Sequence, residues 1–119
     1  MMLTHTMLAD GAIAKYSAVS IGRFDNTVQP AYWPDPSIVS IVIGLALNDG
    51  GDGSEIEVCI MGPVTSNLFN FERGRPIYIG VGGYLTQKIP DRSIYRIGKA
   101  VAVNTIMVLP SEVFMLRLM

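Results

Sequence analysis

Two residue types that often carry out enzyme chemistry each occur once in this chain, as His5 and Cys59. Nucleophilic catalysis needs a histidine held rigidly between a nucleophile and an acid, and His5 stands near a chain end, where fraying is expected. Cys59 lies within an alternating apolar pattern, with no basic neighbour in sequence to activate its thiol. One cysteine also excludes an internal disulfide and a cysteine-rich metal site. We therefore predict no catalytic residue.

The segment from Asn48 to Glu55 has the composition of a calcium-binding loop. If the loop begins at Asn48, Gly50 and Asp52 fall at ligand positions and Gly53 falls at the sharp turn. The position that requires a bidentate glutamate is occupied by Cys59, inside an apolar run. We therefore predict a negatively charged hairpin turn here, and no metal site.

Two further patterns have the composition of a functional site without its context. A dinucleotide-binding turn has a third glycine at a fixed spacing and is followed by a helix. The segment with Gly80, Gly82 and Gly83 has neither. Glu55 and Glu57 would share one face of a strand, as paired carboxylates require, but nothing adjacent supplies a pocket or a third group. We predict a solvated face and no cofactor.

The composition limits what elements can position these residues. Of 119 residues, 50% are apolar and 16% are charged, against about 25% charged in typical domains. The longest apolar run, 38–47, has ten residues with two interruptions, so neither a membrane span nor a cleaved leader is expected. A net charge of −1 argues against direct nucleic-acid binding.

Short runs rich in β-branched and aromatic residues, separated by glycine and proline, predict strands throughout the chain. The expected strands are 18–21, 38–47, 55–61, 76–79, 84–88, 94–103, 105–109 and 112–118. The fold class is therefore all-β, as a small barrel or packed sheets of short antiparallel strands. We divide the chain into an N-terminal arm (1–8), a β domain (9–110) and an apolar C-terminal strand or tail (111–119).

The two halves of the β domain resemble one another, which favours an internal duplication over chance similarity. The copies span about 18–62 and 76–110. Each contains a strand with a glycine turn, a second strand, an Ile-Gly strand and a final strand. Copies this small would share one core. Gly44 and Gly98, inside equivalent strands, would mark equivalent bulges or close backbone approaches.

Charge is distributed unevenly along the chain. Acidic residues are concentrated around the 48–57 loop, and six of the nine basic residues lie between 73 and 99. Complementary fields of this kind favour head-to-tail or partner contacts, the alternative being a solvated surface. The apolar segment 112–119 is either a closing strand of the core or a strand donated to a neighbouring subunit.

Several segments, in this order and spacing, resemble a family of small phage virion proteins, the head decoration (cement) proteins and related tail-fibre or baseplate modules. The resembling segments are 9–14, 17–19, 42–48, 52–58, 62–64, 74–80, 83–86, 96–100 and 105–108. The resemblance implies a protein without catalysis that binds a protein lattice as a dimer or trimer. It implies a place in the virion, on the capsid surface or the tail, after synthesis in the host cytoplasm.

The sequence therefore predicts a capsid decoration protein whose partners are the major capsid protein or other virion proteins. The alternatives are a tail-fibre or baseplate module, and a small carbohydrate- or ligand-binding β-barrel that uses Tyr32, Trp33 and the acidic loop. Apolar and aromatic anchors dominate interfaces. We therefore expect a set of such residues either to contact partners or to lie in the core. The candidates are Met7, Leu8, Tyr32, Trp33, Phe69, Phe114 and Leu116.

Overall fold

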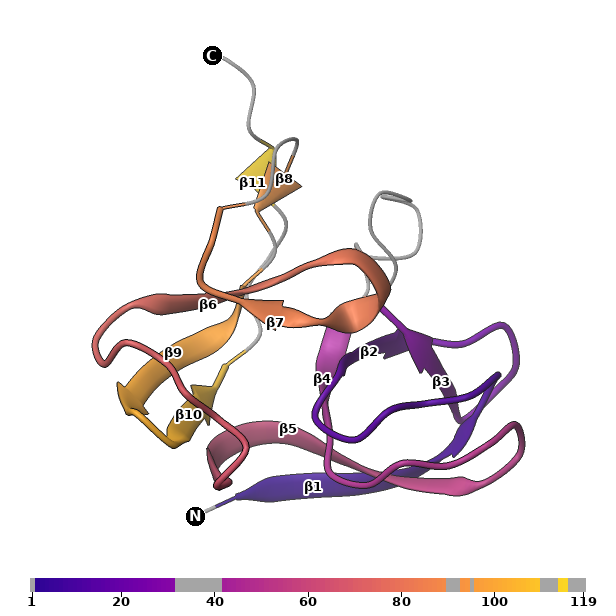
Figure 1. Ribbon diagram of the computed structural model, residues 1–119. Coiled ribbons are helices and arrows are strands. Elements are labelled where there is room, and N and C mark those ends of the chain that lie inside the picture. The colour runs from indigo at the N-terminus through magenta and orange to yellow at the C-terminus, as the bar shows by residue number, and fades with distance from the viewer. Residues whose placement is uncertain (1, 32–41, 90–92, 95, 110–113, 116–119) are drawn as a thin grey trace.

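The computed structural model describes residues 2–31, 42–89, 93–94, 96–109 and 114–115, and these form an all-β protein (Figure 1). Its strands are β1 (Leu3–Ala9), β2 (Ala18–Ile21), β3 (Thr27–Pro30), β4 (Val42–Ala46), β5 (Glu55–Thr65), β6 (Pro76–Ile79), β7 (Leu85–Thr86), β8 (Ser93–Ile94), β9 (Arg96–Ala102), β10 (Thr105–Val108) and β11 (Phe114–Met115). The 3₁₀ turn η1 (Val81–Gly83) joins β6 to β7. The predicted fold class is confirmed.

The first five strands form a closed barrel. Their order is β1-β3-β2-β4-β5, and β1 closes the circle by pairing with β5 as well as with β3. Residues 3–8 of the expected N-terminal arm (1–8) therefore supply most of the barrel strand β1. Only the pairing with β5 and β3 shows that this segment is a barrel strand.

A second sheet continues from the far end of β5, in the order β5-β10-β9-β6-β7. The strand can serve both sheets because it bends at Gly62, whose φ of 123° is in the region that favours glycine. Residues before the bend pair with β1 and β4, and residues 62–65 pair with β10.

Two apolar clusters form the core. One fills the barrel and contains Val19, Val28, Ala46, Ile56 and Val58, with Ala9 and Ile13. The other lies between the outside of the barrel and the second sheet. It contains Ala18, Leu45 and Cys59 from the barrel, and Ile77, Ile97, Ile106 and Val108 from the second sheet. Alternating residues of β2, β4 and β5 thus serve both clusters, which explains why these strands are apolar on both faces.

The register shows that the second sheet repeats the barrel strand for strand. We call residues 3–61 the first unit and residues 62–109 the second unit. The order β3-β2-β4-β5 of the first unit matches β7-β6-β9-β10 of the second. In addition, residues 63–65 pair with β10 as residues 4–6 pair with β5, so the end of β5 occupies the place of β1.

Backbone hydrogen bonds at equivalent positions have matching partners. The Tyr16 amide donates to the Ala46 carbonyl over 2.8 Å, and the Gly74 amide donates to the Ala100 carbonyl over 2.7 Å. The Gly22 amide donates to the Thr27 carbonyl, as the amide of Gly80 does to that of Tyr84. This agreement is what an internal duplication would produce.

Gly44 and Gly98 occupy equivalent bulges, as expected. The register shifts beside each of them, at Val19/Ser20 and at Ile77/Tyr78. A Cβ on Gly44 would overlap the Cys59 carbonyl oxygen, and a Cβ on Gly98 would overlap that of Met107. Both glycines are therefore required by a close approach of backbone to backbone.

The repeat differs in detail from the expected copies. The overlay of the two halves by sequence aligns Thr27 with Leu85, whereas the register aligns Val28 with Leu85, because the second hairpin turn is one residue shorter. The copies also begin at 3 and 62 rather than 18 and 76.

The C-terminal segment pairs at least partly within the chain. Phe114 and Met115 form β11, which is antiparallel to β8. The rest of the predicted strand or tail, 111–119, lies outside the described residues.

Candidate functional site

Among the predicted contact residues whose side chains the structure describes, Met7, Leu8 and Phe69 do not share one exposed surface. Met7 is half-buried against the barrel core, whereas Leu8 is exposed. Phe69 is buried and packs against Tyr16, with ring centroids 4.9 Å apart and ring planes tilted by 59°, so it lies in the core, one of the two expected places. The backbone of Phe114 lies in β11. Tyr32, Trp33 and Leu116 lie outside the described residues.

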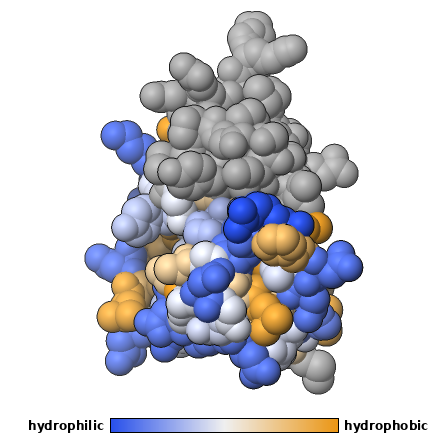
Figure 2. Space-filling view, turned by 90° about the vertical axis from the view of Figure 1, so that its right-hand side faces the viewer, coloured by the Kyte–Doolittle hydropathy of each residue, from blue (hydrophilic) through white to orange (hydrophobic). Residues whose placement is uncertain are grey.

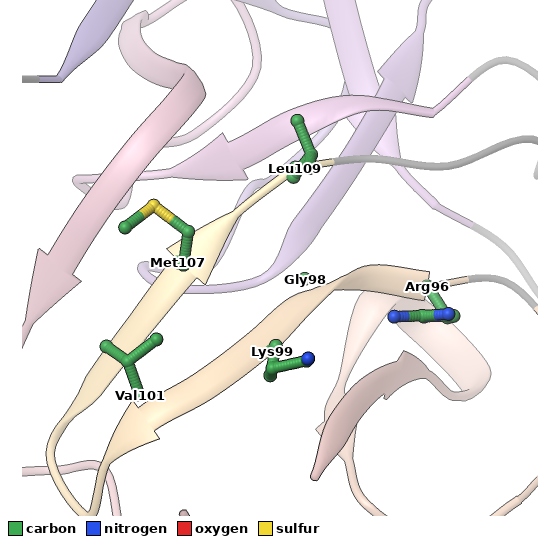
Figure 3. Close-up of a pocket in the computed structure, with 6 residues that line it drawn as sticks. All are labelled: Arg96, Gly98, Lys99, Val101, Met107 and Leu109. Carbon is green, nitrogen blue, oxygen red and sulfur yellow. The ribbon is translucent and has the colours of Figure 1, made fainter. Parts of the chain in front are cut away.

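An exposed apolar surface is found instead on β9 and β10. Arg96, Gly98, Lys99, Val101, Met107 and Leu109 line an open pocket of about 300 Å³ on the side of these strands that faces away from the core. Figure 3 shows the side chains of β9 and β10 arranged around the central Gly98. We call this surface the β9–β10 face.

The strand register explains why these side chains lie together. Pro63, Met107, Lys99 and Pro76 occupy successive cross-strand positions from β5 to β6. Gly98 adds no side chain beside them, and Val101, two residues after Lys99, lies on the same side by ordinary strand alternation. The side chains of Val101, Met107 and Leu109 keep 42%, 38% and 56% of their surface exposed. These are large fractions for apolar residues clustered on a sheet.

The same face of the first unit is covered. By the register, Leu45 is the equivalent of Lys99, and Cys59 is the equivalent of Met107. Both are fully buried, because the second unit packs over them with Ile97, Ile106 and Val108. One fold unit therefore presents this face in two states within a single chain, one covered and one open.

The two charged regions lie on opposite sides of the molecule. Arg96 and Lys99 border the β9–β10 face, whereas the loop between β4 and β5 lies at the other side of the barrel (Figure 1). Asp49, Asp52 and Glu55 are exposed on that loop, which we call the acidic hairpin. On the barrel side, hydrophilic residues surround separate hydrophobic patches (Figure 2).

The acidic hairpin forms internal hydrogen bonds rather than a calcium loop. The Asn48 side chain accepts from the Glu57 amide over 2.8 Å and donates to the Glu55 carbonyl over 3.1 Å. Asp52 accepts from the Gly11 amide over 2.8 Å. These bonds hold the hairpin in shape and leave Asp49 and Glu55 facing solvent.

A separate ion pair joins the end of β1 to the turn between β2 and β3. The buried carboxylate of Asp10 accepts from the Arg23 amide, Nε and Nη2 over 2.9, 3.0 and 2.8 Å. These hydrogen bonds and the nearby positive charge lower the pKa of Asp10 to about 2. The guanidinium also lies 5.2 Å from the centre of the Phe24 ring. Because every bond closes a barrel corner, we assign this pair a structural role.

The other titratable candidates are Cys59, Glu57 and His5, and their surroundings indicate a structural role. Cys59 is buried, and this burial raises the pKa of its thiol. The hydroxyls of Thr4 and Thr6 lower the pKa of Glu57 by hydrogen bonding, and Thr6 Oγ1 donates to Glu57 Oε1 over 2.9 Å. His5 is exposed on β1, opposite Val58. Within the described ranges, no three His, Cys, Asp or Glu side chains gather closely enough to hold a metal ion.

None of the helical turns in the described part of the chain has the length and apolarity to cross a membrane. No protein-family model, curated protein or solved structure matches this sequence. The resemblance to phage virion modules accordingly stays a prediction.

Sequence reasoning did not find the β9–β10 face. Val101 and Met107 lie in predicted strands that are apolar on both faces, so the sequence pattern does not show which face is exposed. The usable signal was the comparison of the repeats, in which the first unit has leucine and the second unit has lysine at equivalent positions of β4 and β9.

Proposed function

We propose that this protein is a non-enzymatic structural module that binds other proteins, and specifically a phage capsid decoration protein. The observation that supports the proposal is the β9–β10 face, an exposed apolar surface on a rigid sheet. A sheet face is well suited to cover a protein lattice, since its backbone is held by strand pairing before binding and little backbone entropy is lost. The resemblance of the sequence to virion modules supports the finer assignment.

The mechanism would be burial of apolar area at many equivalent sites. Specific protein interfaces bury about 1,600 Å² in total, and repeated attachment to one lattice multiplies a modest individual affinity. Val101, Met107 and Leu109 would supply the apolar centre, with Arg96 and Lys99 at its border.

The test is binding of the purified protein to purified phage heads and, separately, to tails, followed by sedimentation and quantification of bound copies. Saturable binding to heads, with a rise in the temperature at which the heads release their DNA, is the expected result. Saturable binding to tails alone would replace this assignment by the tail module. Absence of binding to either particle part would overturn the proposal.

A further inference from the structure

We propose that the β9–β10 face binds the acidic hairpin of a second copy of this chain, which gives head-to-tail self-association. This inference deepens the proposed function, since it identifies which partner covers the exposed face, but it is tested on the isolated protein. It is argued from the covered face of the first unit, from the charges on both surfaces and from their positions.

The comparison of the two units indicates what kind of partner fits. The covered face has Leu45 and packs against apolar side chains of the second unit. The open face has Lys99 at the equivalent position, between Met107 and Pro76. A charge at the border of an apolar face favours a partner that brings a carboxylate, because an ammonium group that loses water without a counter-charge is destabilised.

Among the described residues, no carboxylate forms an ion pair with the basic border of the face. The lining residues include Arg96 and Lys99 and no carboxylate. The ion pairs between described residues involve Arg23 with Asp10 and Arg75 with Glu72, so neither border cation has an acidic partner there. A partner carboxylate would therefore not compete with an existing pair.

The acidic hairpin has the complementary properties. It exposes Asp49, Asp52 and Glu55. Its tip is narrow at Gly51 and Gly53, which carry no side chains, and the space beside them is open, since an added Cβ would meet no atom within 4 Å. The internal bonds of Asn48 hold it in one conformation, which reduces the entropy lost on binding. A narrow acidic tip suits an open pocket of about 300 Å³ with a basic border.

The positions of the acidic hairpin and the β9–β10 face make the contact between them intermolecular. The hairpin and the β9–β10 face lie on opposite sides of one molecule (Figure 1), so each copy can give its hairpin to one neighbour and receive that of another. A contact between two different surfaces forms a ring when its rotation closes, and a chain when it does not.

The experiment is analytical ultracentrifugation of the full chain at about 20 mM and about 500 mM salt, since the screening length falls several-fold between them. Self-association at low salt that weakens at high salt is expected. Lys99→Glu should weaken it roughly tenfold or more, and so should Asp49→Lys combined with Glu55→Lys. Arg73→Glu and Asp25→Lys, which change exposed charges outside both surfaces, are the matched controls and should associate normally.

Mixing the two defective variants separates this contact from general charge effects. The Lys99→Glu chain keeps its hairpin and the Asp49→Lys/Glu55→Lys chain keeps its face, and their two reversed surfaces also carry opposite charges. Mixing the two variants should therefore restore an association that neither shows alone. Circular dichroism checks that each variant is folded. A monomeric wild type at low salt, or a mixture that stays monomeric, would overturn this inference. Binding of wild-type protein to phage heads would in that case still support the proposed function.

Discussion

In the first unit, β1 runs as far as Ala9 and pairs with β3, which closes a barrel, whereas in the second unit the equivalent strand ends at Thr65. The hydroxyl of Ser66 accepts from the Leu68 amide, and its carbonyl accepts from the Phe69 amide, so the chain turns there. Phe69 then enters the core between the units. A change in a few residues after one strand thus converts a closed barrel into an open sheet that covers its neighbour.

The consequence of this difference lies in the outer faces. The open inner side of the second unit needs a cover and finds it on the outer face of the first, where Leu45 and Cys59 are buried. The outer face of the second unit then has no third unit to cover it within the described chain. The comparison teaches that one fold unit can be both a core component and a docking surface, according to what lies next to it.

Alanine at the two bulge glycines should have the largest effect. A Cβ at Gly44 would overlap the Cys59 carbonyl, and at Gly98 it would overlap that of Met107. We expect Gly44→Ala to lower the free energy of unfolding by about 3 kcal/mol or more, because β4 and β5 are packed on both faces. Gly98→Ala should cost less, since β9 and β10 can move toward solvent. Urea unfolding of both variants measures the difference, and equal losses would contradict the asymmetry.

Truncation of the side chains at a second pair of equivalent positions, Leu45 and Lys99, should give a clearer difference in unfolding free energy between the units. Leu45→Ala removes a fully buried side chain and should cost about 2–3 kcal/mol of unfolding free energy. Lys99→Ala, at the exposed equivalent position, should change it by less than about 0.5 kcal/mol. Both values come from urea unfolding in salt high enough to suppress association. A large loss for Lys99→Ala would mean that the face is part of the core.

The ion pair of Asp10 predicts an acid sensitivity located in the first unit. The folded-state pKa of about 2 lies below the ordinary value of 3.8, so the ionised carboxylate stabilises the fold above about pH 4. That contribution is lost as the pH falls from about 4 to 2. Asp10→Asn should therefore be less stable at pH 5 and should show a smaller further loss towards pH 2.

Urea midpoints measured at pH 5, 4, 3 and 2 test this dependence. Glu72→Gln, which removes the exposed pair with Arg75 in the second unit, is the control. An Asp10→Asn chain with the acid dependence of the wild type would show that other groups are responsible.

The rate of thiol modification should distinguish the covered face of the first unit from the β9–β10 face, with little change in the free energy of unfolding. Burial shields Cys59 and raises the pKa of its thiol, so both access and thiolate fraction are low. In a Met107→Cys chain, the new thiol at the equivalent exposed position should react about a hundredfold faster or more with a disulfide reagent. Absorbance recorded at high salt follows the fast reaction of the introduced thiol and the slow reaction of Cys59. Reaction of Cys59 at the faster rate would show that the units separate readily.

Much of the local structure could be predicted from the sequence. The alternation of Ile56, Val58 and Ile60 with polar residues indicated a strand, and the glycines of 50–53 and 80–83 indicated hairpin turns. Gly44 and Gly98 were correctly assigned to equivalent bulges. These features follow from side-chain alternation and backbone freedom, which act over a few residues.

The candidate site could not be predicted in the same way. The sequence left Phe69 open between partner contact and core, because an aromatic residue in a loop has no pattern that separates the two, and in the fold it is buried. Met7 and Leu8 were placed on an arm because strand pairing with β5, fifty residues away, leaves no local mark. Val101 and Met107 look like core residues in the sequence and are exposed in the fold.

The sequence by itself determined an all-β fold with two similar halves, since strand propensity and turn residues are local properties. Only the tertiary structure decided that one half closes as a barrel, that the other packs across its outer face, and that the β9–β10 face is left open. The physical reason is that the burial of a residue depends on which unit packs against it. The same apolar position is core where a second unit covers it, and it is available surface where none does.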